Sequence, residues 1–301
     1  MKKLVFDVGA SYIKYALMDD EAFIVLKGQV KTPQDGLDSF LNVLKEIYLQ
    51  YENQINGIAM SVPGIIDSSC GQIYAPGGLH YNENVNLVDC VHQFTNLPVT
   101  LENDGKCAAL AELWKGNLKD YQDGVVIVVG SALGGGIVKD KKLWKGQHLF
   151  AGEFSYIWQG NIEYFEKRSW ASMGSTSALI EETAKRKHIS CKELDGKRIF
   201  EMIDSGDEDA IKALEMITKE LAKGIYNLQC IIDPQKILIG GGISQQPLFI
   251  QKIQDALDVI YSKFHYDIPR VQIETCRFYN DSNLIGALYH YQCMQSYIEG
   301  N

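Results

Sequence analysis

Two stretches of the chain share one pattern, in which an apolar strand runs into a glycine-containing turn and a second strand follows. One stretch is LVFDVGASYIKYAL, residues 4–17, and the other is VIVVGSALGGGIV, residues 126–138. Each is followed by a mixture of strand-like and helix-like segments. Such alternation is typical of α/β proteins. The repeated pattern therefore predicts two α/β domains of similar outline.

Hydrophobic periodicity predicts the elements of each half. Residues 35–51 form an amphipathic helix, because apolar side chains recur with the i, i+3, i+4, i+7 spacing. The run 124–130 is continuously apolar and bounded by glycine, which is typical of a fully buried strand. The other expected strands are 3–9, 12–19, 22–30, 56–62, 98–103, 134–144 and 236–242, and the other expected helices are 106–114, 175–187, 207–231, 247–263 and 283–298.

Turn-forming residues collect around 113–123, where no strand or helix pattern continues. We place the domain boundary there. A small domain is expected to comprise residues 1–113 together with the last helix, 285–301, and a large domain to comprise 114–284.

Composition excludes several classes of protein. The net charge of −9 and the pI near 5.2 argue against nucleic acid or an anionic membrane as the main partner. The seven cysteines form no C-x-x-C pair, so they are expected to be reduced thiols rather than disulfides or a zinc site. No apolar run reaches the length of a signal peptide core or a membrane span, which favours a cytoplasmic protein.

Three polar residues, Glu102, Asn103 and Asp104, stand where an expected strand ends and an expected helix begins. One interpretation is a helix cap, with Asp104 accepting hydrogen bonds from the first backbone N–H groups of the helix. The other is a catalytic carboxylate with an amide beside it. The two are compatible, because the helix macrodipole favours negative charge at this end, where Asp104 would accept a proton from an attacking hydroxyl.

Three glycine-rich turns follow apolar strands. In DVGAS, Gly9 and Ser11 would offer N–H groups and a hydroxyl to phosphate, and Asp7 would hold a hydrated Mg²⁺; the alternative is a plain hairpin turn. GSALGGG, residues 130–136, is neither a P-loop nor a dinucleotide fingerprint, and it is either a second phosphate clamp or a loose loop. GGG at 240–242 would let adenine or ribose lie on bare backbone, or would serve close helix–strand packing.

Glu153 stands in an otherwise apolar run, FAGEFSYI. It is either solvated, as most glutamates are, or buried against partners such as sugar hydroxyls. The glycine-rich turns, the polar residues at a helix start and this carboxylate together describe a phosphotransferase, in which positioning and charge neutralisation do most of the work.

The motifs, and their order along the chain, resemble those of the ROK family of sugar kinases. FDVGAS is similar to the family's first phosphate motif, GSALGGGIV to its second, ENDGKCAALAE to the motif that carries the catalytic base, AGEFSY to the sugar motif, and NLQCIIDPQKILIGGGIS to the adenosine segment. The resemblance covers nearly the whole chain. It implies a two-domain actin-like ATPase (ribonuclease H-like) fold of class α/β, with an interdomain cleft.

The resemblance also implies the chemistry and its residues. ATP and Mg²⁺ would be used to phosphorylate the 6-hydroxyl of a glucose-type sugar, with Asp104 as general base and Asp7 holding Mg²⁺ through water. A homodimer is also implied. The sugar-binding residues would be Asn103, Glu153, Tyr156, Gly64 and Gly78, and the ATP-binding residues Asp7, Gly9, Ser11, Lys14, Gly130, Ser131, Gly134, Gly135, Gly241 and Gly242.

Several positions depart from the family pattern. Residues 157–175 contain no cysteine, so we predict no structural zinc, and Tyr156 replaces the motif histidine. An aromatic face stacks on a sugar ring, which favours a β-glucoside such as cellobiose, or glucose, as acceptor. Ala10 and Ala132 replace phosphate-loop glycines, and Lys106 replaces an asparagine. The alternatives are a non-catalytic sugar-sensing regulator, a kinase for another hexose such as N-acetylmannosamine, and an actin-like ATPase without a sugar acceptor.

Overall fold

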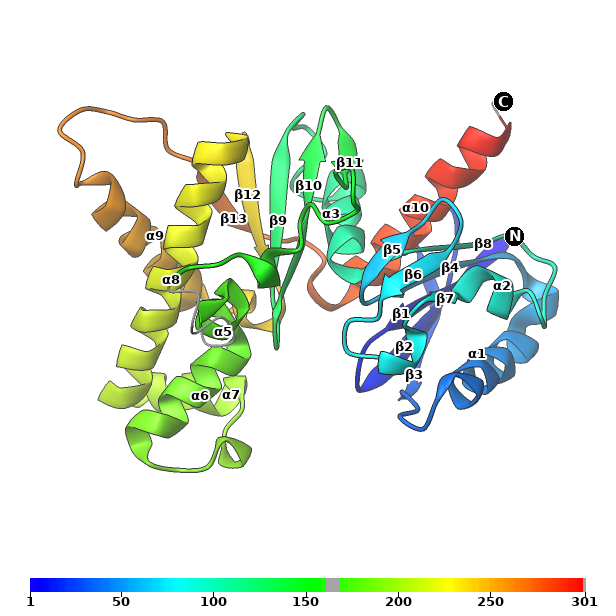
Figure 1. Ribbon diagram of the computed structural model, residues 1–301, viewed down its shortest axis with the longest axis horizontal. Coiled ribbons are helices and arrows are strands. Elements are labelled where there is room, and N and C mark those ends of the chain that lie inside the picture. The colour runs from blue at the N-terminus through cyan, green and yellow to red at the C-terminus, as the bar shows by residue number, and fades with distance from the viewer. Residues whose placement is uncertain (161–167, 300–301) are drawn as a thin grey trace. The chain divides into compact units, whose positions relative to one another are not determined.

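The computed structural model describes residues 1–160 and 168–299 (Figure 1). The chain folds into two compact units. The first contains Met1–Lys119, Leu143–Ala151 and Asp281–Asn301, and the second contains Asp120–Lys142 and Gly152–Asn280. Relative to the division expected from the sequence, the first unit gains residues 114–119, 143–151 and 281–284. The chain thus passes back into the first unit for one short segment, which no composition shift marks.

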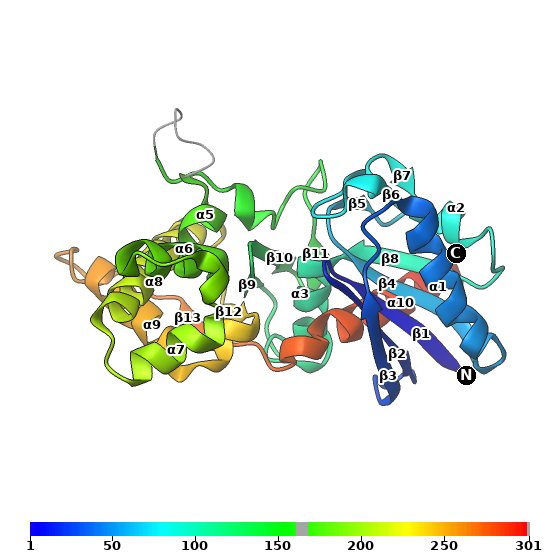
Figure 2. The ribbon, with the colours of Figure 1, turned by 90° about the horizontal axis from the view of Figure 1, so that it is seen from below.

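The first unit is built on a five-stranded sheet with the order β3-β2-β1-β4-β8 (Figure 2). β1 pairs antiparallel with β2 and β2 with β3, whereas β1, β4 and β8 run parallel. The carboxyl ends of β1, β4 and β8 therefore meet at one edge. The strands are β1 (Lys2–Val8), β2 (Tyr12–Met18), β3 (Ile24–Lys31), β4 (Ile55–Val62) and β8 (Val99–Asn103).

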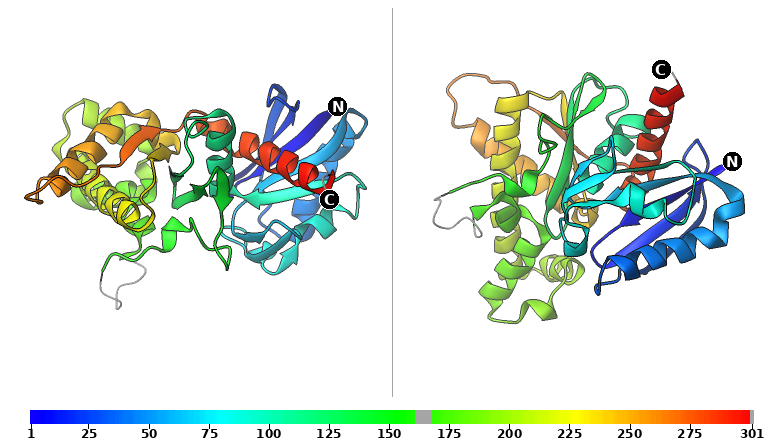
Figure 3. Two further views of the ribbon diagram at one scale, coloured as in Figure 1. Left: turned by 90° about the horizontal axis from the view of Figure 1, so that it is seen from above. Right: turned by 45° about the vertical axis from the view of Figure 1, so that its right-hand side comes forward.

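Helix α1 (Leu37–Tyr51) covers one face of this sheet. Alternate residues of β1 point to opposite faces, and Leu4 and Phe6 share a buried cluster with Phe40 and Leu44 of α1. On the other face, helices α3 (Asp104–Lys115) and α10 (Ser282–Glu299) pack against the strands. The red helix α10 runs beside the teal helix α3 in both views of Figure 3.

A small three-stranded sheet and a short helix in the first unit were not predicted. The sheet has the order β5-β6-β7. Strands of two to four residues are too short to display a period, so only tertiary pairing defines them. These elements are β5 (Ile65–Asp67), β6 (Gln72–Ala75), β7 (Val85–Asn86) and α2 (Leu87–Val91).

A second five-stranded sheet repeats the strand order of the first, as β11-β10-β9-β12-β13, and its strands β9, β10, β12 and β13 belong to the second unit. β9 pairs antiparallel with β10 and parallel with β12, and β12 pairs parallel with β13. The antiparallel hairpin and the two following parallel strands thus correspond one for one with those of the first sheet, which confirms the duplication predicted from the sequence. The strands are β9 (Gly124–Val129), β10 (Leu133–Lys139), β11 (Lys142–Trp144), β12 (Lys236–Gly240) and β13 (Gln272–Thr275).

The helices of the second unit pack around α8 (Glu208–Ile232). Trp170 of α5 (Trp170–Gly174) is fully buried, and its indole N–H donates to the carbonyl of Glu220 at 3.1 Å. A Cβ at Gly224 would lie 2.2 Å from the Trp170 ring, so α8 needs a glycine where it meets this ring. The expected helices are present as α6 (Thr176–Lys187), α8 and α9 (Pro247–Tyr261), whereas α7 (Gly196–Asp204) was not predicted.

Among the helices of residues 1–160 and 168–299, none is both long enough and apolar enough to cross a membrane.

Candidate active site

Asp7 lies at the carboxyl end of β1 and is buried, with three side chains around its carboxylate. Asn283 of α10 donates to Oδ1 at 3.0 Å, and Ser61 of β4 donates to the same oxygen at 3.3 Å. The ammonium of Lys14 on β2 is 3.4 Å from Oδ2. Asp7 and Lys14 were predicted from the sequence, but Ser61 and Asn283 were not, since no local pattern links them to this strand end.

The turn between β1 and β2 is tight, because the Gly9 N–H donates to the carbonyl of Tyr12 at 3.0 Å. Ala10 and Ser11 are exposed at its tip. Neither Ala10 nor Ala132 is among the described non-glycine residues with positive φ. The methyl groups that replace two family glycines are therefore carried by ordinary backbone and strain neither loop.

The helix that follows β8 is capped by Asn103, not by Asp104. Asn103 Oδ1 accepts the Lys106 N–H at 3.0 Å, which corrects the expectation that Asp104 would be the cap. Asp104 is instead the first helical residue, and its Oδ1 accepts the N–H of Gly105 at 2.8 Å. The Asp104 carboxylate therefore lies at the positive end of the helix in addition to the asparagine that provides the cap.

Asn103 also connects the start of α3 to Gly64, one of the expected sugar-binding glycines. Its Nδ2 donates to the carbonyl of Gly64 at 2.9 Å. Gly64 has φ of 119°, and a Cβ there would lie 2.1 Å from the Ala75 carbonyl oxygen, so this turn requires glycine. A Cβ at Gly78 would lie 3.4 Å from that of Ala10. The first unit therefore gathers the residues predicted around Asp104 and those of the first glycine loop at one edge of its sheet.

Behind Asn103 lies a buried ion pair that was not predicted. Glu102 has no exposed surface, and its Oε2 is 3.1 Å from Nζ of Lys145. His290 of α10 is also buried, and its Nε2 has no hydrogen-bond partner among the residues that the structure describes. Burial lowers the pKa of His290 below 6.5, the nearby Glu102 opposes this shift and Lys145 adds to it.

We expect His290 to make the protein less stable as the pH falls below 6.5. The unfolded imidazole takes up a proton near pH 6.5, but the buried one does so only at lower pH, so the free energy of unfolding falls by up to about 1 kcal/mol per pH unit. Denaturant unfolding at pH 7.5 and 5.5 should show a smaller loss in His290→Gln. The exposed His80, changed to Gln, is the control, and an equal loss in both variants would contradict the expectation.

In the second unit, Gly130 and Ser131 form the tip of the β9–β10 hairpin. The Gly130 N–H donates to the carbonyl of Ala132 at 3.0 Å, and the carbonyl of Gly130 accepts the N–H of Thr176 at 2.8 Å. Thr176 begins α6, whose cap is Ser175. The loop is therefore a tight hairpin held to a helix N-terminus, which excludes the alternative of a loose loop.

A cavity of 370 Å³ opens beside this hairpin, within the second unit. Three of its residues, Gly130, Ser131 and Gly242, were predicted to bind ATP. The others come from the end of β9, the starts of α6 and α7 and the segment after β12, and Ile243 among them lies in the expected adenosine segment. These include Thr176, Gly196, Lys197, Phe200, Ile243 and Gln246. A cavity with one aromatic ring, glycine backbone and nearby helix N-termini suits a nucleotide.

Gly242 allows a test of this cavity. Apart from its chain neighbours, no atom of the described residues would lie within 4 Å of a Cβ at this position, so Gly242→Leu is expected to fill the cavity without disturbing the fold. The KM for ATP should rise about 10-fold or more, while the melting temperature and the KM for sugar stay unchanged. Gly242→Ala is the graded control and should have a small effect. An unchanged KM for ATP in the leucine variant would remove the cavity from the nucleotide site.

Two predicted ATP-binding glycines are explained by packing. A Cβ at Gly135 on β10 would lie 2.1 Å from the Val126 carbonyl oxygen and 2.5 Å from the Phe154 ring. Gly241 has φ of 91°, and a Cβ there would lie 2.1 Å from the Val129 carbonyl oxygen. Both positions demand glycine whatever they bind, so close packing is sufficient for them. Gly134 lies next to Gly135 on β10. The binding of ATP by Gly134 and Gly135 stays a prediction.

Glu153 is half-buried and directly precedes a short helical turn, Phe154–Tyr156, in which Tyr156 is 52% exposed. Ser155 of this turn joins it to the second glycine loop, because its hydroxyl donates to the Leu133 carbonyl at 2.7 Å and accepts the Leu133 N–H at 3.1 Å. The expected sugar motif and the second phosphate loop are therefore neighbours inside one unit.

Metal ligands are sparse at these positions. No group of three or more His, Cys, Asp and Glu side chains suited to a metal occurs within the described residues. Asp7 is a single buried carboxylate with an ammonium nearby, which suits Mg²⁺ bound through water and phosphate rather than by a protein cage. The cysteine-free stretch 157–175 includes 161–167, which lie outside the described residues.

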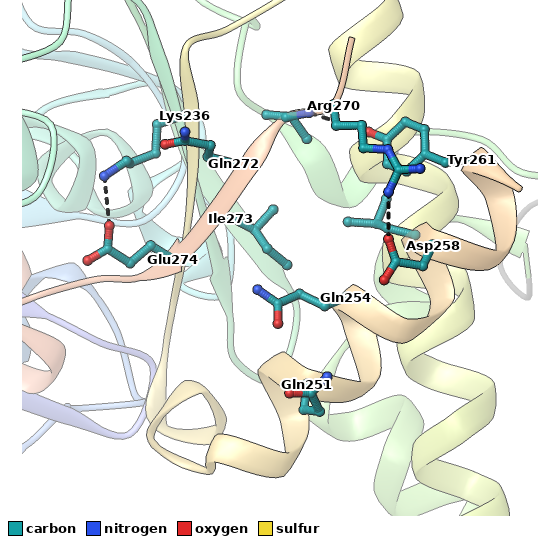
Figure 4. Close-up of a pocket in the computed structure, with 11 residues that line it drawn as sticks. Lys236, Gln251, Gln254, Asp258, Tyr261, Arg270, Gln272, Ile273 and Glu274 are labelled. Atoms are coloured by element: carbon teal, nitrogen blue, oxygen red, sulfur yellow. Dashed lines mark hydrogen bonds and ion pairs between the residues drawn. The ribbon is translucent and has the colours of Figure 1, made fainter. Parts of the chain in front are cut away.

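A larger cavity of 560 Å³ lies between α9 and β13 (Figure 4). Gln254 and Ile273 point into it, and two ion pairs lie at its sides, Lys236 with Glu274 at 2.7 Å and Arg270 with Asp258 at 3.1 Å. It contains none of the glycine loops, and both of these cations are already paired. This cavity is therefore separate from the candidate site.

The two sheets have the same strand order, and in each a glycine turn joins the two strands that come first in the chain. This arrangement is the actin-like ATPase fold. A ROK family protein of Streptococcus pneumoniae in complex with sucrose has this fold with a TM-score of 0.88, 28% identity, and coverage of 99% of this chain and 100% of that one. A ROK glucokinase of Streptomyces griseus in complex with glucose and AMPPNP has a TM-score of 0.82 at 22% identity, with 96% and 98% covered.

The chain belongs to the ROK family, whose model matches residues 4–292. A β-glucoside kinase of Listeria innocua is 30% identical over 293 residues, which are 97% of both chains. An N-acetylmannosamine kinase of Yersinia pestis is 26% identical over 291 residues, 95% of this chain and 97% of its own. These relatives are kinases, and this chain is by class a kinase as well.

Proposed function

We propose that this protein transfers the γ-phosphate of ATP to the 6-hydroxyl of a glucose-type sugar, with Asp104 as general base. The observation that carries the proposal is the division of labour at the start of α3. Asn103 caps the helix and holds Gly64, while Asp104 stands at the first helical position, directly after the carboxyl end of β8. A general base must be held in position, and the fixed backbone at Asn103 supports this for Asp104.

In the proposed reaction the sugar hydroxyl gives its proton to a carboxylate oxygen of Asp104 as its oxygen attacks the γ-phosphorus. The bond to the β-phosphate oxygen breaks, and ADP leaves. The macrodipole of α3 keeps the negative form of Asp104 favourable before the transfer. Positioning and charge neutralisation supply most of the remaining acceleration.

The phosphate-side roles extend the same proposal. Gly9 and Ser11 in one unit, and Gly130 and Ser131 in the other, would offer backbone N–H groups and hydroxyls to the phosphates. Mg²⁺, when bound, would neutralise phosphate charge, and Asp7 would hold it through water. Lys14, 3.4 Å from the Asp7 carboxylate, would add positive charge there. The interdomain cleft expected from the resemblance stays a prediction.

For the acceptor we propose a β-glucoside such as cellobiose, with glucose as the simpler member of the class. β-Glucoside kinases from two Listeria species and from Klebsiella pneumoniae are 28–30% identical to this chain. The half-exposed ring of Tyr156 supports the same class, because an aromatic face stacks on a pyranose. N-Acetylmannosamine is the second candidate, on the strength of the Yersinia relative.

A coupled ADP-release assay with ATP, Mg²⁺ and a sugar panel tests the proposal. The panel contains glucose, cellobiose, arbutin, mannose, N-acetylmannosamine and fructose, with a control without sugar. Turnover that depends on glucose or a β-glucoside would support the proposal, and turnover with N-acetylmannosamine alone would replace the acceptor. Sugar binding by calorimetry without turnover would establish the sugar-sensing alternative, and hydrolysis without any sugar would establish the plain ATPase.

The resemblance also leads us to propose a homodimer. Sedimentation equilibrium of the full chain checks this, and a monomeric mass at micromolar concentration would contradict it.

A further inference from the structure

The buried pair of Glu102 and Lys145 links two parts of the first unit that lie far apart in sequence. The Glu102 side chain is 1% exposed and that of Lys145 is 23% exposed, with Nζ 3.1 Å from Oε2. Lys145 Nζ also donates to the hydroxyl of Ser68 at 2.5 Å. A buried charge that loses its partner is strongly unfavourable, so the pair constrains both segments.

Lys145 belongs to the short segment, Leu143–Ala151, that returns to the first unit before the chain reaches Glu153. The carbonyl of Lys145 accepts the N–H of Ala151 at 3.1 Å, which closes residues 145–151 into a loop. Gly146 turns the chain with φ of 69°. The position of Lys145 is therefore tied to the backbone that leads directly into the expected sugar motif.

On the other side of the pair, Glu102 holds the backbone beside the proposed base. Its Oε1 accepts the N–H of Asn103 at 2.9 Å. Asn103 in turn accepts the Lys106 N–H and donates to Gly64. Each bond restricts the chain at the residue that precedes Asp104. The charge on Glu102 is met by Lys145, whereas burial lowers the pKa of the nearby His290 and keeps its imidazole neutral.

We propose that Lys145 is a positioning residue, which through Glu102 fixes the backbone of Asn103 and thereby the orientation of Asp104. The loop that leads into the sugar motif then sets the geometry of the base. The catalytic part of this inference rests on the function proposed above. Lys145 touches no reacting atom in this scheme, so its effect falls on kcat rather than on the KM for ATP.

The kinetic test replaces Lys145 by Met, which keeps the length of the side chain and removes its charge. We expect kcat to fall about 10- to 100-fold with the KM for ATP unchanged, and Lys145→Arg to retain most of the activity. The double variant Glu102→Gln with Lys145→Met should recover part of the loss, because a glutamine leaves no uncompensated charge and still accepts the Asn103 N–H. The exposed Lys142, changed to Met, is the matched control.

Two kinetic results would overturn the inference. An unaltered kcat in Lys145→Met would show that the pair does not position the base. A double variant no more active than Lys145→Met would show that the lysine acts on a substrate and not through Glu102.

Hydrogen exchange of the protein without substrates tests the structural step independently of turnover. The amides of Asn103 and Lys106 are expected to exchange faster in Lys145→Met, and to be protected again in the double variant. Unchanged protection would overturn the inference even in an active kinase. Failure of the proposed function would instead appear as no turnover by the unaltered protein on any sugar, and the exchange result would still decide the role of Lys145.

Discussion

Replacing Asp104 by Asn is expected to lower kcat about 100- to 10,000-fold, the range that a positioned general base contributes. The amide keeps the size of the side chain but cannot take the proton of the sugar hydroxyl. Asn103, which caps the helix, is untouched, so the melting temperature and the affinity for sugar should change little. The ADP-release assay, calorimetry with the accepted sugar and thermal unfolding measure the three quantities.

Asp38 provides the matched control for this variant. It is an exposed aspartate in the first turn of α1, so Asp38→Asn makes the same change at another helix N-terminus of the same unit. Its kcat should stay at the unaltered value. Near-normal turnover of Asp104→Asn would remove Asp104 from the role of base, and a large loss of stability would show that its contribution is to the helix.

Replacing Gly286 by Ala is expected to destabilise the first unit by about 3 kcal/mol, at the upper end of the usual cost of overpacking. Gly286 lies in α10, and a Cβ there would lie 1.7 Å from the carbonyl oxygen of Cys107 in α3. Both atoms belong to backbone, so no flexible side chain can move aside. The helices would have to separate, and the contact of Asn283 with Asp7 lies one turn away on the same helix.

Overpacking and helix propensity predict changes of opposite sign in the free energy of unfolding, so the measurement distinguishes them. Helix propensity alone predicts that alanine stabilises a helix interior by about 1 kcal/mol relative to glycine. Gly196→Ala is the control, because a Cβ at that position of α7 would meet its nearest atom at an ordinary 3.5 Å. Denaturant unfolding should show a large loss for Gly286→Ala and little change for Gly196→Ala. A stabilised Gly286→Ala would mean that the two helices are not closely packed.

Most of the regular structure could be predicted from local patterns. The amphipathic helix at 35–51 is present as α1, and the buried run at 124–130 is present as β9, because burial on one face or on both leaves a direct trace in the residue order. The similar order of strands and turns in the two halves could be predicted for the same reason. The short strands β5–β7 left no such trace.

In the candidate site, too, some features have a signal in the local sequence and others do not. Asp7, Asn103, Asp104 and the glycine loops carry signals in their own neighbourhoods, namely strand ends, turns and a helix start. Which of Asn103 and Asp104 caps the helix was not predictable, because both residues favour that position. The choice follows from the contact of Asn103 with Gly64, thirty-nine residues earlier in the chain.

The order of residues along the chain was thus enough to specify the duplicated α/β architecture, the glycine turns and the acidic residue at the start of a helix, since each depends on neighbours in sequence. Only the tertiary structure decided which side chains surround that residue. Lys145 reaches Glu102 and Asn283 reaches Asp7 across 43 and 276 positions. Pairings of this kind depend on how strands and helices pack, and packing brings together residues whose sequence neighbours give no sign of the contact.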